Sequence, residues 1–186
     1  MLKKTGIALA VLVAIAVAVI ATRPDSFRVE RSSLVAAPPA SVFPLVNDFH
    51  KWTAWSPWEK LDPNLKRSYE GPSEGAGAKY AWVGNSEVGE GRMTIVDSKA
   101  PGSISIKLEF LKPFASTSDT LFTFAPDGAG TRVTWTMSGR NNLMAKAFSV
   151  FMDMDKMVGP DFEKGLAAMK TLAEADAAKA VPEEKR

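Results

Sequence analysis

SISIKLEF, at residues 103–110, alternates apolar and polar side chains without a break. Successive side chains of a strand point to opposite faces, so its four apolar residues share one face. A second stretch, GTRVTWTMSG at residues 130–139, repeats the alternation with Val133, Trp135 and Met137. Both stretches therefore predict strands with one apolar and one solvated face.

Working outward, the chain between residues 65 and 126 divides into four more short stretches of this kind. They are 65–71, 78–84, 89–98 and 118–126, separated by turn residues such as those of Gly84-Asn85, Pro101-Gly102 and Asp127-Gly128. Short connections join antiparallel neighbours, so the six stretches predict an antiparallel meander. Residues 27–36 predict one earlier strand, and the segments that start at Pro39 and Trp52 predict short helices.

After Gly139 the apolar spacing changes to that of a helix. Phe162, Leu166, Met169 and Leu172 form one stripe, which predicts a long amphipathic helix that covers the apolar face of the sheet. Proline lacks a backbone donor, so Pro160 predicts a kink or break in this helix. The order of elements is α+β, with a domain at residues 27–175 and a charged tail at 176–186.

The N-terminal residues 1–22 predict a membrane-directed helix. Lys3 and Lys4 precede an uncharged run at 5–22, which as a helix is about 27 Å long at ~1.5 Å per residue, close to a hydrocarbon core of ~30 Å. Residues 23–26 form a linker. The lysines favour a single-pass anchor in the cell membrane, with the domain on the periplasmic or extracytoplasmic side. The alternative is a cleaved signal peptide, with a mature chain that starts near residue 19 or 22.

Composition excludes several classes of function. The formal charge of +2 comes from Lys3 and Lys4, so the rest of the chain is neutral and lacks the basic surface of a nucleic-acid-binding protein. The chain has no cysteine and one histidine, His50, which argues against disulfides, thiolate chemistry and zinc or iron–sulfur sites. We therefore expect no metal and no cofactor. The sequence does not predict an oligomeric state.

Several motifs resemble the START/Bet v 1-like (SRPBCC) superfamily, in particular bacterial proteins labelled polyketide cyclase/dehydrase or lipid-transport-like. The matching residues are Ala-Pro-Pro-Ala-x-Val-Phe at 37–43, Asn47-Asp48, Trp52, Trp-Ser-Pro-Trp-Glu at 55–59, Tyr-Glu-Gly-Pro at 69–72, Gly84-Asn85 and Asp-Phe-Glu-x-Gly-Leu at 161–166. The resemblance covers about residues 27–175. It implies a helix-grip fold, in which a curved antiparallel sheet wraps around the C-terminal helix.

That fold places the apolar face of the sheet opposite the helix, where a ligand cavity or a solid core can form. As ligand-binding residues we predict Tyr69, Tyr80, Trp82, Ile106, Leu108, Phe122, Trp135 and Gly165, the last because a helix residue without a side chain leaves room. Trp52, Trp55 and Trp58 are interpreted as an aromatic plug at the open end of the sheet, with a cavity rim as the alternative.

Catalytic candidates are weak. Asp48, His50 and Ser56 lack the spacing of a catalytic triad, so we expect no catalytic role for His50. Glu59 and Asp62, with Arg67 and Tyr69 downstream, are the best acid/base candidates, although solvated loop charges explain them more simply. The sequence thus favours membrane-tethered binding of a hydrophobic small molecule or lipid over catalysis. The alternatives are a polyketide cyclase or dehydratase acting on an aromatic substrate, and a protein-interaction module with a filled core.

Overall fold

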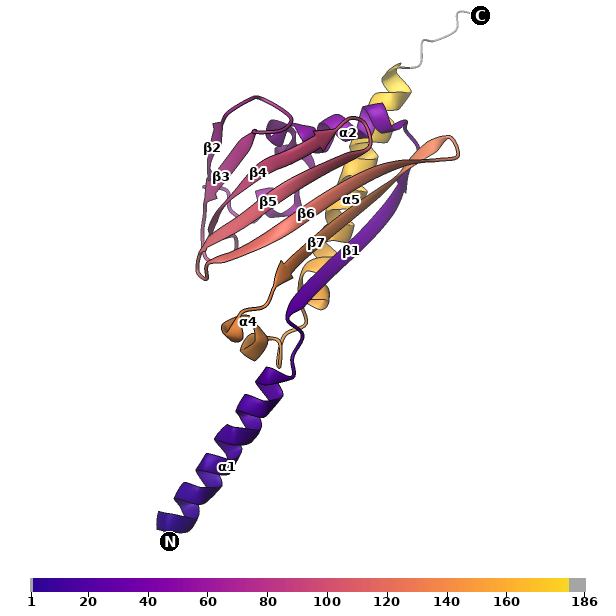
Figure 1. Cartoon of the computed structure of the whole chain (residues 1–186). Helices are drawn as coiled ribbons and strands as arrows, with labels where there is room; N and C mark the ends of the chain where they lie inside the picture. Colours follow the sequence, from indigo (N-terminus) through magenta and orange to yellow (C-terminus); the bar gives the residue numbers. More distant parts are fainter. Residues whose placement is uncertain (1, 181–186) are drawn as a thin grey trace, which may run out of the picture.

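The computed structural model describes residues 2–180 and contains one seven-stranded antiparallel sheet (Figure 1). The strands are β1 (Ser26–Val35), β2 (Lys66–Glu70), β3 (Lys79–Val83), β4 (Glu90–Lys99), β5 (Ser103–Lys112), β6 (Ser116–Asp127) and β7 (Gly130–Arg140). Their order is β1-β7-β6-β5-β4-β3-β2, so the six-strand meander predicted from the sequence is confirmed. The first strand pairs with the last, with Ser26 opposite Arg140 and Val35 opposite Thr131.

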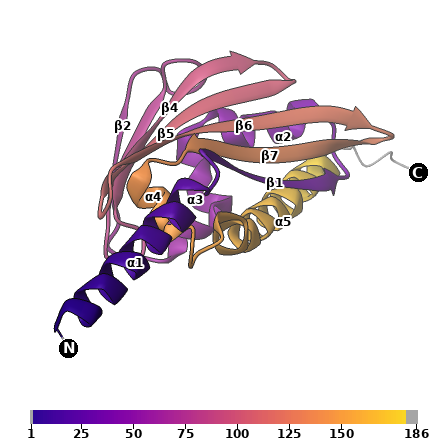
Figure 2. The ribbon, with the colours of Figure 1, turned by 60° about the horizontal axis from the view of Figure 1, so that its bottom comes forward.

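The helices complete the predicted order. They are α1 (Leu2–Ala21), α2 (Pro39–Asn47), α3 (Trp52–Trp55), α4 (Leu143–Phe148) and α5 (Met154–Ala180), with the 3-10 turns η1 (Phe49–Lys51) and η2 (Pro57–Lys60) beside α3. Pro44 lies inside α2, beyond its first turn. Figure 2 shows the sheet arching over α3 and α5. This is the helix-grip arrangement.

The core lies between the sheet and α5, on what we call the inner face. Val29, Ile95, Ile104, Phe122 and Val133 are fully buried there by the alternation of the strands. Phe162, Leu166 and Met169 of α5 are buried against them, which confirms the predicted helix stripe.

The prediction of a helix break at Pro160 is wrong. Helix α5 starts at Met154 and continues through Pro160, and the interruption falls at residues 149–153 instead. Arg31 of β1 crosses the helix at Gly159, where a side chain would collide with the guanidinium. Its ion pairs with Asp155 at 2.8 Å and Glu163 at 2.7 Å bind the helix on both sides of the proline. These contacts offset the missing backbone hydrogen bond.

Helix α1 projects from one end of the domain, and α5 reaches Ala180, past the predicted start of the tail at residue 176. The rest of the predicted tail, residues 181–186, lies outside the described residues. Within residues 2–180, no helix meets the joint requirements of length and apolar character for crossing a membrane.

Candidate functional site

Trp135 of β7 is the centre of an aromatic cluster between the sheet and α5. Its ring stacks on Phe162 of α5 at a centroid distance of 4.0 Å and lies 4.8 Å from Phe122 of β6. Trp55 and Trp58 meet it edge-on at 5.6 and 5.8 Å. We call these five residues, together with Trp52, the tryptophan cluster. Ring contacts of this kind fill the space in which the sequence predicted a possible ligand cavity.

Gly165 lies against this cluster. A Cβ atom at this position would lie 2.9 Å from Trp135 Cζ3 and 3.2 Å from Pro57 Cδ. Because Gly165 has no side chain, the Trp135 indole and Pro57 can pack directly against the helix, and they fill the space beside Gly165. The glycine serves the close approach of helix and sheet.

The tryptophans differ in what their indole N–H groups do. Trp52 Nε1 donates to the Val46 carbonyl at 3.0 Å and Trp55 Nε1 to the Leu45 carbonyl at 2.8 Å, which fastens α3 to α2. Trp135 Nε1 is buried and has no acceptor among the described residues. A buried donor without a partner lowers stability by roughly 1–3 kcal/mol. The centre of the cluster thus holds an unused donor.

A groove of about 290 Å³ opens on the surface between η2 and α5, directly outside the cluster. Its walls are Trp55, Ser56, Pro57, Trp58, Lys60, Leu61, Asp161, Lys164 and Ala168. Trp55 and Trp58 line the groove and also contact the Trp135 ring, so one layer of rings separates the groove from that ring. Lys60, Asp161 and Lys164 supply charge, and Lys164 Nζ lies 2.9 Å from Asp161 Oδ1.

The sequence singled out the tryptophans of this groove but missed its other wall. Asp161, Lys164 and Ala168 lie three and four residues apart in α5, which puts them on one side of the helix. That spacing was visible in the sequence. What was not visible is that η2 lies opposite this side.

A second set of rings lies at the β2–β3 edge of the inner face. His50 stacks on Tyr69 at 4.0 Å, Tyr69 lies 5.3 Å from Tyr80, and Tyr80 lies 5.8 Å from Trp82. We call these four residues the tyrosine stack. The predicted ligand-binding residues are thus divided between two sites. Tyr69, Tyr80 and Trp82 belong to the stack, Phe122, Trp135 and Gly165 lie at the cluster, and Ile106 and Leu108 lie on β5 of the same face.

Glu59 connects η2 to the tyrosine stack. Its side chain is only 6% exposed, and it accepts hydrogen bonds from the Tyr80 hydroxyl and from Arg67 Nε, both at 2.6 Å. Burial, and then the bond to Glu59, raise the pKa of Tyr80 well above its ordinary range, so the hydroxyl stays protonated and donates. The bond to Glu59 also raises the pKa of Arg67. Each carboxylate oxygen of Glu59 therefore already has a strong donor.

The other catalytic candidates do not join this network. Asp62 accepts from the backbone N–H groups of Asn64 at 2.8 Å and Asn85 at 2.7 Å, and it thereby holds two turns together. His50 Nδ1 lies 2.8 Å from Asp48 Oδ1. Ser56 is buried beside Trp55, and no hydrogen bond between described residues connects it to His50. Within residues 2–180, no group of three or more potential ligands is arranged to hold a metal ion.

Known structures share the fold of this chain. The di-domain ARO/CYC StfQ from the steffimycin biosynthetic pathway matches with a TM-score of 0.61 and 13% identity, over 82% of this chain and 52% of StfQ, so this chain spans about half of that protein. The KanY protein matches with a TM-score of 0.60 and 18% identity, over 80% of this chain and 98% of KanY. The Aha1 dimer from Colwellia psychrerythraea matches with a TM-score of 0.58 and 12% identity, over 80% and 96%. At these identities the likeness concerns the fold alone.

The sequence comparisons add the family. No curated protein matches the chain. A family model described as "Polyketide cyclase / dehydrase and lipid transport" matches residues 26–174, which is nearly the whole domain and includes both aromatic groups. The chain therefore belongs to this polyketide cyclase/dehydrase and lipid transport family, within the START/Bet v 1-like (SRPBCC) superfamily.

Proposed function

We propose that this protein binds a hydrophobic small molecule or lipid and is tethered to a membrane by α1. The observation that carries the proposal is the groove between η2 and α5, with two tryptophan walls and a charged rim. Binding sites for apolar ligands combine such walls with a few polar groups, and their volumes start at roughly 300 Å³. At about 290 Å³ the groove accommodates a small aromatic molecule or part of a lipid.

The proposed site extends inward from the groove. Trp58 is half-buried and meets Trp135 edge-on, so a rotation of its side chain opens the groove toward the Trp135 ring. An acceptor atom on a ligand that reaches Nε1 would satisfy this indole, the buried N–H of the cluster that has no acceptor among the described residues. Trp135 and Phe122 contact the ligand in this opened form. The ligand's apolar part lies against Trp55 and Trp58.

Native mass spectrometry of the protein purified from its own cells tests this site. We expect a co-purified molecule on the wild-type chain and its loss in Ala168→Trp, which fills the groove. The matched control is Leu121→Trp, which fills a second groove of about 340 Å³ on the outer face of the sheet. Retention by Ala168→Trp together with loss by Leu121→Trp would move the site to the outer face. No bound molecule on the wild type would favour a protein-interaction module with a filled core.

A cyclase or dehydratase is the second candidate, because the buried Glu59 carboxylate follows the groove residue Trp58 in sequence. Both oxygens of Glu59 already accept a hydrogen bond, from Arg67 and from Tyr80, and Glu59 is not among the walls of the groove. We therefore place binding first. If the wild type converts the co-purified molecule to a product and the Glu59→Gln variant does not, catalysis replaces binding as the proposed function.

For the tether, we propose that α1 anchors the domain to the cell membrane, with the domain on the extracytoplasmic side. Ile7, Leu12 and Val17 are each at least 60% exposed, so α1 has apolar side chains that the domain does not cover. Lys3 and Lys4 lie near the start of α1, ahead of these apolar residues. We expect an intact chain in the membrane fraction, digested by protease added from outside. A mature chain that starts near residue 19 or 22 would show that the helix is a cleaved signal.

A further inference from the structure

The end of the domain from which α1 emerges exposes large apolar side chains. Phe151 is 89% exposed, Leu143 is 75% exposed and Phe114 is 63% exposed. With Leu111, Met144 and Phe148 they form what we call the apolar end. Soluble surfaces rarely gather so many large apolar residues in one place, and such patches mark contact with another apolar phase.

Three segments that are distant in sequence build this surface. The β5–β6 hairpin contributes Leu111 and Phe114, α4 contributes Leu143, Met144 and Phe148, and the connection from α4 to α5 contributes Phe151. Phe114 and Phe148 are in ring contact at 5.7 Å, which joins the hairpin to α4. The surface is therefore a property of the fold.

The linker after α1 is fastened to the same end. Asn141 donates from its backbone N–H to the Asp25 carbonyl at 2.8 Å and from Nδ2 to the Pro24 carbonyl at 3.0 Å. Lys146 of α4 forms an ion pair with Asp25. Helix α1 also contacts α4. The exit of α1 is thus fixed beside the exposed apolar residues.

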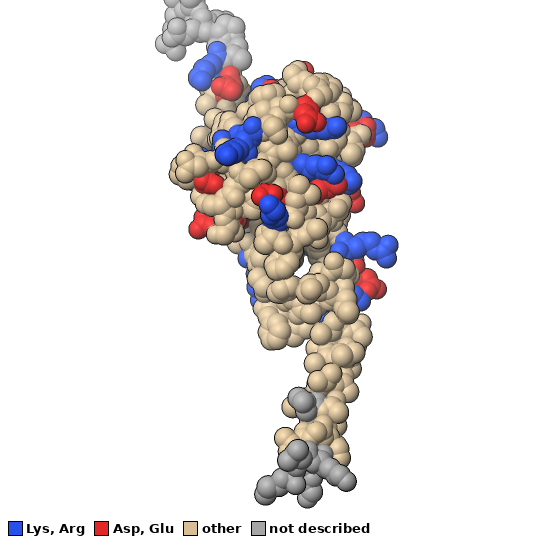
Figure 3. All heavy atoms as spheres, turned by 90° about the vertical axis from the view of Figure 1, so that its left-hand side faces the viewer, with Lys and Arg blue, Asp and Glu red and all other residues tan. Residues whose placement is uncertain are grey.

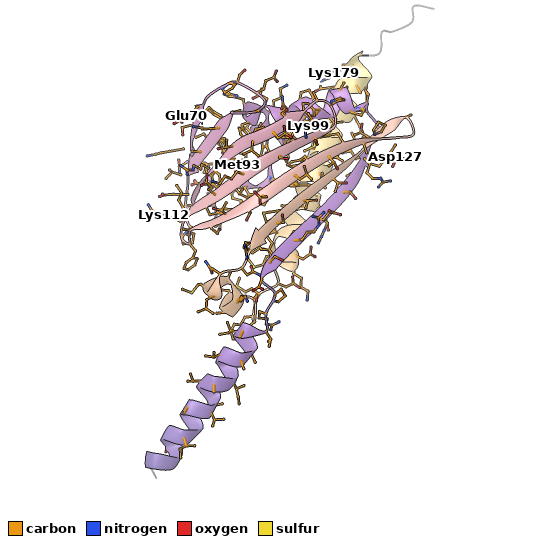
Figure 4. All side chains as sticks on the ribbon, in the orientation of Figure 1. Glu70, Met93, Lys99, Lys112, Asp127 and Lys179 are labelled. Carbon is orange, nitrogen blue, oxygen red and sulfur yellow. The ribbon has the colours of Figure 1, made fainter. Side chains whose placement is uncertain are left out.

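Charge gathers toward the other end of the domain. Figure 3 shows blue and red side chains over the body of the domain and a mostly tan surface that leads into α1. In Figure 4, Asp127, Lys99 and Lys179 lie at the end away from α1. The apolar end therefore lies on the less charged side of the domain, although Lys112 and the Lys146–Asp25 pair lie close to it (Figure 4).

We propose that the apolar end docks into the surface of the lipid bilayer that receives α1. We infer a bilayer as the partner of this surface because the surface is continuous with α1, whose own exposed side chains are apolar. The phase that surrounds α1 therefore also reaches α4 and the tip of the β5–β6 hairpin. Interfacial elements of this kind bury their apolar side chains about 5–10 Å into the boundary between headgroups and acyl chains. The inference rests on the proposed tether and adds a second contact, which orients the domain on the membrane.

The absence of cysteine makes a direct test possible. The full chain is reconstituted in phosphatidylethanolamine–phosphatidylglycerol vesicles, with an environment-sensitive fluorophore on a single introduced cysteine. The docking positions are Phe114→Cys and Phe151→Cys, the tether position is Val13→Cys, and the far-end control is Asp127→Cys. Lipids that carry a nitroxide near the headgroup or deep in the acyl chain report the depth of each label.

We expect strong quenching at residues 114 and 151 by the shallow nitroxide, strong quenching at 13 by the deep one, and little at 127. If the label at residue 13 is quenched but the labels at residues 114 and 151 are quenched as little as the label at 127, the docking proposal is overturned and the tether stands. A blue shift at 114 and 151 without quenching would identify a protein partner or a second copy as the occupant, which also overturns it. No quenching at 13 would overturn the tether and the docking together.

A charge substitution gives an independent readout. With the label at 114, Phe151→Glu should remove most of the shallow quenching, because a carboxylate in the acyl-chain boundary is strongly disfavoured. The matched control is Leu34→Glu on β1, another exposed apolar residue, 47% exposed and paired with Arg132 toward the far end. We expect no change there. Equal quenching in both variants would exclude residue 151 from the contact.

Discussion

The tryptophan cluster and the tyrosine stack lie on the same inner face, and they differ in how their polar atoms are used. In the stack, the Tyr80 hydroxyl donates to Glu59, and Trp82 Nε1 donates to the Val88 carbonyl at 3.0 Å. In the cluster, Trp135 Nε1 is buried and has no acceptor within residues 2–180. These two donors of the stack therefore have acceptors within the protein, whereas the Trp135 donor gains a hydrogen bond only when something else enters. This difference is why we place ligand binding beside Trp135 and assign Glu59 to structure.

The largest expected effect is that of Trp135→Ala. A filled cluster predicts a loss of about 3–5 kcal/mol in the free energy of unfolding, as for other large-to-small changes of core aromatics. Urea unfolding of the full chain, followed by near-ultraviolet circular dichroism, measures it. A loss of only about 1–2 kcal/mol would show that part of the ring already faces a void, because fewer packing contacts are then removed.

Tyr80→Phe tests the hydrogen bond between the tyrosine stack and Glu59. It deletes the hydroxyl that donates to the buried Glu59 carboxylate, and a hydrogen bond to a charged group contributes about 1.5–3 kcal/mol. The control is Tyr69→Phe in the same stack, whose hydroxyl makes no hydrogen bond to the described residues. We expect a change within about 0.5 kcal/mol there. Equal losses in the two variants would mean that the bond to Glu59 contributes nothing specific.

Gly165→Ala should lower stability by about 1 kcal/mol, because overpacking against Trp135 costs about 1–3 kcal/mol and the gain in helix propensity returns up to about 1 kcal/mol. A double-mutant cycle with Trp135→Phe sharpens this prediction. The smaller ring lacks the atom that the new methyl group meets, so the loss should shrink in that background. Additive effects would place the strain elsewhere, for example at Pro57.

His50→Ala has the smallest expected effect. The imidazole is about half-exposed. It lies on the surface side of the tyrosine stack, where it contacts Asp48 and Tyr69. We expect a stability change within about 0.5 kcal/mol, and ligand occupancy within a few-fold of the wild type. A loss of several hundred-fold in any assayed function, with the fold intact, would mean that the Asp48–His50 pair belongs to an active site.

The order of strands and helices was predictable because each element carries its own pattern. The alternation in β5 and β7, the turn residues between strands and the stripe Phe162, Leu166, Met169 are local signals. The residues that carry the family resemblance lie in the elements and in the turns that join them. The break at Pro160 was mispredicted because the contacts that hold α5 there come from Arg31, which is distant in sequence. A residue's local preference yields when tertiary contacts outweigh it.

The candidate site was predictable only in part, for a related reason. The alternation of side chains along each strand predicted which residues point inward. It does not predict whether the side chains that face one another leave a space or fill it. That outcome depends on the stacking of Trp135 with Phe162 and on the approach of Pro57 to Gly165 across the helix. The groove was missed because its two walls, η2 and α5, are separated by most of the domain sequence.

The pairing of β1 with β7 has a consequence for how this chain is made. The strand beside α1 is synthesised first, yet its hydrogen-bonding partner is the last strand, with Ser26 opposite Arg140. Until β7 emerges, β1 is an unpaired strand next to an apolar helix, and contacts between residues so distant in sequence form slowly. Unpaired strand edges promote aggregation during that interval. A chain arrested before β7 therefore keeps its N-terminal helix and the rest of the meander but has no partner for its first strand, and we expect it to depend on chaperones until synthesis is complete.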